Sequence, residues 1–157
     1  MRKARIEDLD VINELTDVMH KHMANLYRLE LSRGELEEEH FDEEELDNTY
    51  VAESAGNVVG YISFSKGKNE WAGPYYEIEH IVVAEKHRRQ RLGRQLFNIV
   101  LEKAKRDKVN ITAGTLARNQ GALRFYQELG FKPLSIGLLL DVQKRIPEQG
   151  VEFHRAI

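Results

Sequence analysis

The chain has 157 residues, of which 41% are hydrophobic and 31% are charged, and its formal net charge is -3. This length predicts a single domain, spanning residues 1–157, with room for a substantial hydrophobic core. The slightly acidic balance gives no global attraction to nucleic acid, and the absence of cysteine excludes disulfides, thiolate nucleophiles and zinc–thiolate sites.

The N-terminus is charged at Arg2 and Lys3, and no apolar run approaches the length that crosses a membrane. We therefore expect a cytoplasmic protein with no signal peptide and no membrane partner. A metal site is not expected either, because His20 and His22 are two residues apart and do not share a helix face.

The first third of the chain predicts an edge strand followed by a long helix. Residues 1–6 are short and mixed, and Asp8 can cap a helix whose apolar positions begin at Leu9 and Ile12. The helical pattern continues to Leu29 and is broken at Gly34.

Residues 35–47 carry only acidic charges. Such a run is most often a solvated helix face or loop. The alternative is a negative wall that attracts a cationic substrate. The sequence leaves both interpretations open.

The middle of the chain predicts a hairpin, a buried strand and a helix. Residues 49–52 and 58–64 have strand character, and residues 54–57 between them have the composition of a hairpin turn. An apolar, β-branched run at residues 78–83 predicts a buried strand. After a basic loop at residues 86–93, apolar residues recur at helical spacing from Leu92 to Val100.

A strand, a tight basic loop and a helix in this order predict an anion site. The first N–H groups of a helix have no internal partner, and the helix dipole adds positive potential there. Full charges and forked donors that suit phosphate come from Arg88, Arg89, Arg91 and Arg94. We interpret the loop as a pyrophosphate cradle; the alternative is a basic surface loop before an amphipathic helix.

The last third predicts a strand at residues 109–115 and a helix that begins after Asn119 and stops at Gly130. Residues 131–134 and 137–142 predict two closing strands. The whole order predicts an α/β layered domain, a mixed sheet with helices on both faces.

Two segments resemble the signatures of the GNAT acetyltransferase superfamily. The first is Arg88-Arg89-Gln90-Arg91-Leu92-Gly93, which is similar to a loop of Gln or Arg, two variable residues, Gly, one variable residue, and Gly or Ala. The second runs from Asn119 through Tyr126 to Phe131. It matches the family segment at all of its fixed positions, which are Asn119, Ala122, Tyr126, Gly130 and Phe131. The resemblance implies the GNAT fold, an α+β layered fold with a mixed, mostly antiparallel sheet. It also implies the binding of acetyl-CoA. Arg91 is a departure, because the family has a glycine there.

The resemblance also implies roles for individual residues. In the family, a backbone N–H of the central strand polarises the thioester carbonyl, the asparagine lies near the pantetheine arm, and the tyrosine hydroxyl lies near the CoA sulfur. Tyr126 is thus the implied acid for the leaving thiolate, although Asn119 is also explained as a helix cap and Tyr126 as a core aromatic. The implied cofactor-binding residues are Ile81, Val82, Val83, Arg88, Arg89, Gln90, Arg91, Leu92, Gly93, Arg94, Asn119 and Tyr126.

Glu77 and Glu79 are the candidates for the base that takes a proton from an acceptor amine. The strand period of two predicts both on one face with Ile81 and Val83, and His80 on the other. Resemblance to polyamine-type acetyltransferases favours Glu79. The alternative is a strand glutamate paired with an arginine or a lysine.

The sequence therefore predicts an acetyl-CoA-dependent N-acetyltransferase whose acceptor is a primary amine, small and cationic or polyamine-like. Alternatives are acetylation of a protein N-terminus or lysine, and a CoA-binding module without catalysis, which Arg91 keeps open. A nucleic-acid partner is not expected, because no aromatic residues interleave the loop arginines. A homodimer is left open.

Overall fold

The computed structural model describes residues 1–27, 41–140 and 142. Contacts divide the chain into two units, one of residues 1–19 and 38–114 and the other of residues 20–37 and 115–157. The first unit contains the sheet, and the second contains α3 (Gln120–Glu128) and the segment that follows it.

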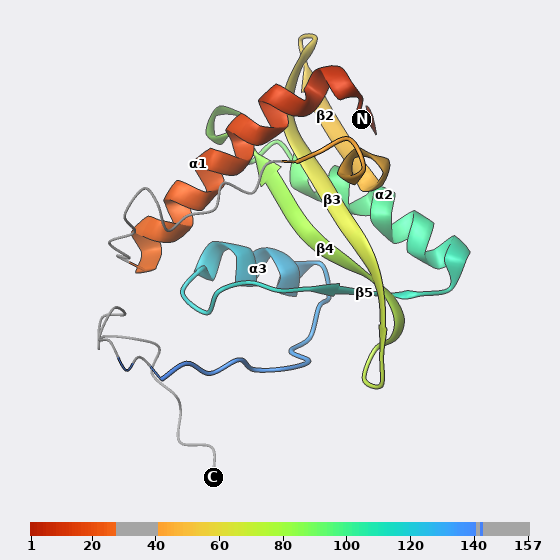
Figure 1. Ribbon diagram of the computed structural model, residues 1–157, viewed down its shortest axis with the longest axis vertical. Coiled ribbons are helices and arrows are strands. Elements are labelled where there is room, and N and C mark those ends of the chain that lie inside the picture. Colours follow the sequence, from red (N-terminus) through yellow and green to blue (C-terminus); the bar gives the residue numbers. More distant parts are fainter. Residues whose placement is uncertain (28–40, 141, 143–157) are drawn as a thin grey trace. The chain divides into compact units, whose positions relative to one another are not determined.

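The sheet has five strands in the spatial order β1-β2-β3-β4-β5 (Figure 1). All neighbours are antiparallel except β4 and β5, which are parallel, so the predicted mixed and mostly antiparallel sheet is confirmed. The strands are β1 (Arg2–Lys3), β2 (Thr49–Ser54), β3 (Asn57–Asn69), β4 (Gly73–Val83) and β5 (Asn110–Ala113).

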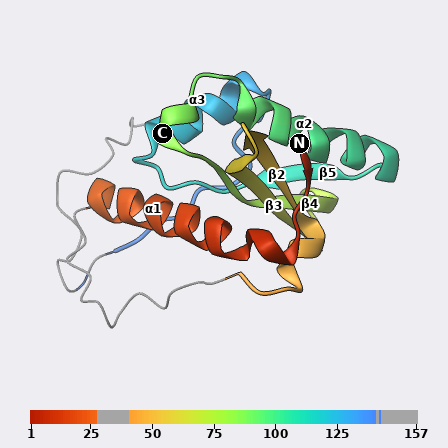
Figure 2. The same cartoon turned by 90° about the horizontal axis from the view of Figure 1, so that it is seen from above.

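Helices cover both faces of this sheet: residues 9–19 of α1 (Leu9–Tyr27) lie on one face and α2 (Leu92–Asp107) lies on the other (Figure 2). The apolar stripe of α2 packs with Ile62, Phe64, Tyr76 and Ile78, forming what we call the α2-side core. The first part of α1 packs through Ile12 against Val51, Tyr61 and Val82 on the other face, forming the α1-side core. Membership of one core or the other shows which face of the sheet a strand residue lies on.

The β2–β3 hairpin is predicted correctly, although its strands are longer than the sequence pattern indicates. Ala55 and Gly56 both have positive φ, 50° and 80°, which matches the twist of a tight hairpin turn. The register of this pair shifts next to Gly60. A Cβ on Gly60 would lie 2.8 Å from the Val82 carbonyl oxygen, so the close approach of β3 to β4 requires glycine here.

Strand β4 contains a bulge at Glu79. His80 pairs with Ser63 and Ile78 pairs with Phe64, which leaves Glu79 as an extra residue that is skipped in the backbone pairing with β3. An extra residue of this kind reverses the alternation of faces on either side of it. Tyr76 and Ile78 before it, and Ile81 after it, accordingly all pack in the α2-side core.

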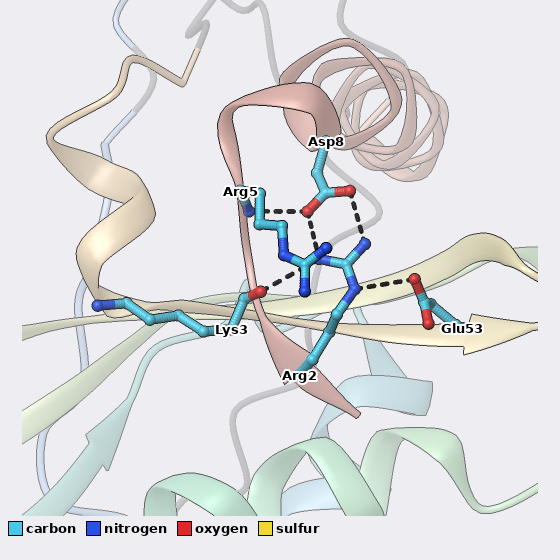
Figure 3. A network of polar contacts seen from close by, with 5 residues as sticks. All are labelled: Arg2, Lys3, Arg5, Asp8 and Glu53. Carbon is cyan, nitrogen blue, oxygen red and sulfur yellow. Dashed lines mark hydrogen bonds and ion pairs between the residues drawn. The ribbon is translucent and has the colours of Figure 1, made fainter.

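A network of polar contacts holds the N-terminal residues (Figure 3). The Arg2 guanidinium donates to both carboxylate oxygens of Asp8, at 2.7 and 2.9 Å, and to Glu53 Oε1 of β2 at 2.8 Å. Asp8 ends the short 3-10 helix η1 (Ile6–Asp8) and also accepts from the Arg5 backbone N–H at 2.8 Å. Asp8 therefore ties the turn before α1 to the sheet. Its carboxylate bonds to Arg2 and Arg5, and the predicted bond to the first turn of α1 is not among the hydrogen bonds of the described residues.

The two predicted closing strands are wrong for the residues that the structure describes. Residues 131–140 and 142 form neither strand nor helix. Their apolar side chains are largely exposed, among them Ile136 at 78% and Leu140 at 85%. A β-branched and leucine-rich run has strand propensity, but a strand also needs a partner ladder, and that is what this segment lacks in the described part of the chain.

No helix in the part of the chain that the structure describes is long and apolar enough to span a membrane. The same residues contain no group of three His, Asp or Glu side chains arranged to hold a metal ion.

Candidate active site

Two arginines in the loop between β4 and α2 have a left-handed backbone conformation. The loop passes through the short helix η3 (Glu85–His87) and then places Arg89 at φ 65° and Arg91 at φ 60°. Residues with side chains seldom adopt this left-handed region, because Cβ crowds the following carbonyl oxygen. The departure at Arg91 is therefore accommodated by strain: the arginine adopts the conformation that a glycine would favour.

The N-terminus of α2 directly follows this loop. Arg91 is the N-cap residue, with φ 60° and ψ 16°, and its side chain makes no capping hydrogen bond among the described residues. The predicted arginines Arg88, Arg89 and Arg94 are exposed around it. Arg88 Nε also donates to the Val83 carbonyl oxygen at 3.2 Å, which ties the loop to the end of β4. The arrangement offers backbone donors and cationic side chains to an anion.

Strand β4 separates from β5 just before this loop. The two strands pair only from Tyr75 with Asn110 to Ile78 with Ala113. From Glu79 to Val83 the edge of β4 that faces away from β3 has no strand partner in the described part of the chain. Backbone groups on that edge are thus available to a ligand lying along β4, apart from the Val83 carbonyl, which accepts from Arg88.

The bulge corrects the predicted faces of β4. Ile81 and Val83 pack on the α2 side, whereas Val82 belongs to the α1-side core. The His80 ring lies 5.5 Å from the Phe41 ring and 6.2 Å from the Tyr61 ring, on the α1 side. Glu77 and Glu79 alternate with Tyr76 and Ile78, so they share a face as predicted. That face is the one of His80 and Val82, and not the one of Ile81 and Val83.

Glu79 has a partner on the neighbouring strand. The Ser65 hydroxyl of β3 donates to Glu79 Oε1 at 2.5 Å, and the Glu79 side chain is exposed. The predicted alternative, pairing of Glu79 with an arginine or a lysine, is not among the ion pairs of the described residues. Nothing in the sequence pattern signals either Ser65 or the bulge.

Phe41, which lies within the acidic segment, links that segment to this face through aromatic contacts. The Phe41 ring meets the Tyr61 ring edge-on, with centroids 5.4 Å apart, and the Phe41 backbone N–H donates to Asn13 Oδ1 of α1. The Tyr61 hydroxyl is 2.6 Å from the Thr16 hydroxyl. The residues after Phe41, from Asp42 to Glu45, are exposed and acidic. Residues 35–40 of the predicted acidic segment lie outside the described residues.

The other two predicted site residues belong to the second unit. Asn119 is the N-cap of α3, and its side chain accepts from the Ala122 backbone N–H at 3.1 Å, so the predicted cap is confirmed. The Asn119 amide also approaches Met23 Sδ at 3.4 Å. Tyr126 is half-buried, and its ring lies 5.1 Å from that of Phe131. Burial raises the pKa of Tyr126 to about 12, so its hydroxyl keeps its proton at neutral pH.

The structure thus brings most of the predicted site residues together in the first unit. Consecutive stretches of β4, the loop and α2 hold Glu77, Glu79, the strand residues Ile81, Val82 and Val83, and the loop residues Arg88, Arg89, Gln90, Arg91, Leu92, Gly93 and Arg94. Asn119 and Tyr126 come from the unit that contains α3.

Comparison with known proteins gives the family. The profile of the acetyltransferase (GNAT) family matches residues 15–131. An L-methionine sulfoximine/L-methionine sulfone acetyltransferase of Salmonella typhimurium is 33% identical over 107 residues, which are 67% of this chain and 57% of that protein. The chain therefore spans little more than half the length of this relative.

Solved structures share the fold. An aminoglycoside N-acetyltransferase, AAC(6')-Iy in complex with CoA, has a TM-score of 0.67 at 16% identity and covers 88% of this chain and 96% of its own. A putative acetyl transferase from Pyrococcus furiosus has a TM-score of 0.67 at 20% identity, with 86% and 96% covered. The family profile spans most of the chain, and strands β2 to β5, the strained loop and α2 lie within the match: the chain belongs to the acetyltransferase (GNAT) family.

Proposed function

We propose that the protein is an acetyl-CoA-dependent N-acetyltransferase that moves the acetyl group to a primary amine by direct attack. The observation that carries this proposal is the parting of β4 from β5 beyond Ile78, immediately before the arginine loop and the N-terminus of α2. One continuous stretch of chain thus offers donors to both parts of an extended ligand with a phosphate end. The edge of β4 offers them to the extended part, and the loop and the start of α2 offer them to the phosphate.

The bound acetyl-CoA supplies an activated acyl group as a thioester. Its phosphates lie against the loop from Arg88 to Arg94, and the pantetheine arm follows the open edge of β4. The backbone N–H of Val83, with Ile81 and Val82 alongside, donates to the thioester carbonyl oxygen, on which negative charge develops.

The acceptor amine must lose a proton, because an ammonium has no lone pair. Its nitrogen then attacks the thioester carbon, the C–S bond breaks, and the product is an amide. Glu79 receives the proton of the amine, directly or through water. Tyr126, which keeps its proton at neutral pH, gives one to the leaving thiolate, so that CoA departs as a thiol. The nitrogen loses its second proton to solvent as the amide forms, and solvent returns a proton to Tyr126.

The acceptor that suits this face is small and cationic, with a polyamine as the simplest example. The charged side chains that β4 presents beside His80 are Glu77 and Glu79, both acidic. The acidic residues 42–45 begin next to Phe41, whose ring packs against His80. Carboxylates on a strand and on the adjoining segment raise the local concentration of cations.

Two measurements test the proposal. Calorimetry should show acetyl-CoA binding to the wild type, weakened about tenfold to a hundredfold by Arg88→Ala or Arg94→Ala, since each removes one charge-assisted contact. Release of free thiol should follow addition of putrescine. Methionine sulfone, suggested by the Salmonella relative, and peptides with a free N-terminus or lysine are the competing acceptors in the same panel.

The outcomes separate the candidate functions. Binding of acetyl-CoA with no thiol release for any acceptor would indicate a CoA-binding module, and no binding would refute the whole proposal. For a cationic acceptor, replacing Glu43, Glu44 and Glu45 by glutamine should raise the KM for the amine. The increase should shrink with added salt, because exposed charges are screened over about 8–10 Å at moderate ionic strength. An unchanged KM would assign these residues to solvated surface.

A further inference from the structure

The carboxylate of Glu79 stands at the one position of β4 where the ladder with β3 is interrupted. The neighbours Ile78 and His80 are paired with Phe64 and Ser63, and Glu79 is the unpaired residue between them. Bulges of this kind re-aim a side chain and are common beside active sites. The exposed Glu79 carboxylate therefore owes its direction to the local backbone, without a wall of packed side chains around it.

A flexible, exposed glutamate gains little from backbone direction alone, because its own rotamers remain free. The hydrogen bond from the Ser65 hydroxyl, at 2.5 Å to Oε1, removes that freedom. Ser65 lies two residues beyond Ser63 on β3, on the stretch whose ladder with β4 is regular, since Ser65 pairs with Glu77. The donor is thus fixed by regular strand pairing, and the acceptor projects from the bulge.

We propose that Ser65 is a positioning residue that orients the Glu79 carboxylate toward the acceptor amine, an inference that rests on the proposed function of Glu79 as the base. A hydroxyl that donates to one oxygen of a carboxylate leaves the other oxygen free to accept a proton. The other titratable groups on this face near Glu79 are Glu77 and His80 on β4 and Tyr61 on β3.

The test compares variants of the two serines of β3. Ser65→Ala should lower kcat/KM about tenfold at neutral pH, the usual worth of one such hydrogen bond, with the loss in kcat and the KM for acetyl-CoA unchanged. Ser65→Thr retains the hydroxyl and should recover most of the rate. The matched control is Ser63→Ala, which removes a neighbouring hydroxyl that lies 3.4 Å from His80 Nδ1 and should change kcat/KM by less than about twofold.

A double variant shows whether Ser65 acts through Glu79. In Glu79→Gln protein, adding Ser65→Ala should change the rate no further, because the group that Ser65 orients is already disabled. A lower thermal stability of Ser65→Ala with an unchanged kcat would overturn the inference and leave Ser65 a structural residue. Equal and additive losses in the two backgrounds would overturn it as well.

A measurement without turnover separates this inference from the proposed function. In protein with 13C-labelled glutamate, the carboxyl resonance of Glu79 should move in Ser65→Ala at pH 7 and stay in place in Ser63→Ala. If the wild type turns over no amine but the resonance moves as expected, the proposed function fails and the Ser65–Glu79 coupling stands. If the wild type is active and the resonance is indifferent to Ser65, the coupling is refuted alone.

Discussion

The backbone of Arg91 makes the substitution Arg91→Gly a sharp test of the strained loop. Arg91 holds φ 60° and ψ 16° at the N-cap of α2, a conformation that costs a residue with a side chain about 1–2 kcal/mol. Glycine adopts it without strain but loses about 0.5–1 kcal/mol through its greater freedom in the unfolded chain. The net expectation is a gain of about 0.5–1 kcal/mol in the free energy of unfolding. For a chain of this size this is a rise in Tm of about 1–4 °C.

The assay is urea unfolding, with Arg94→Gly as the matched control. Arg94 is an exposed residue within the first turn of α2, and glycine there should lower the free energy of unfolding by up to about 1 kcal/mol. The same chemical change three residues along the chain should therefore have the opposite sign. Acetyl-CoA affinity of Arg91→Gly should be unchanged or tighter. A loss of stability in Arg91→Gly equal to that in Arg94→Gly would refute the claim that the loop is strained.

Three further predictions concern single side chains. Tyr126→Phe should lower kcat about tenfold to a thousandfold with little change in acetyl-CoA affinity. Since burial raises the pKa of Tyr126 to about 12, the wild type should lose more stability than the variant as pH rises from 10 to 12, measured by unfolding. Asp8→Asn should cost about 1–3 kcal/mol at neutral pH. Because Arg2 lowers the pKa of Asp8 below 3.8, this stabilisation is present above that pH and lost below it, so acid unfolding curves of the two proteins should converge. Glu79→Gln should lose most of kcat/KM at neutral pH and recover as pH rises and more amine is deprotonated in solution, whereas Glu77→Gln should lose less; the reverse order would assign the base to Glu77.

The sequence pattern predicts the fold well where local signals agree with each other. The apolar run before the arginine loop, the helical spacing from Leu92 and the capping role of Asn119 each come from a short stretch, and each is confirmed. The hairpin turn at residues 54–57 is confirmed for the same reason. Such features depend on neighbours in the chain, which a sequence displays directly.

The errors come from interactions between distant residues. The faces of β4 are predicted from a strict period of two, which fails at Glu79 because a bulge depends on how β3 pairs with β4. The contact of Ser65 with Glu79 spans fourteen positions, and no local signal marks it. The strand propensity of residues 137–142 is real, but propensity does not supply a partner ladder. The roles of Glu77, Glu79, Asn119 and Tyr126 in the reaction stay predictions.

Because of the bulge in β4, the proposed base Glu79 is an extra residue that the pairing of β3 with β4 does not need. A chain that lacked residue 79 would join Ile78 directly to His80, and these two already face Phe64 and Ser63, which are consecutive on β3. The ladder would then become regular, and the apolar side chains on both faces would keep their places. Loss of Glu79 by deletion would thus leave the core and the arginine loop in register. Under the proposed function, the loss of this one codon would remove the base and leave the residues proposed to bind CoA in place.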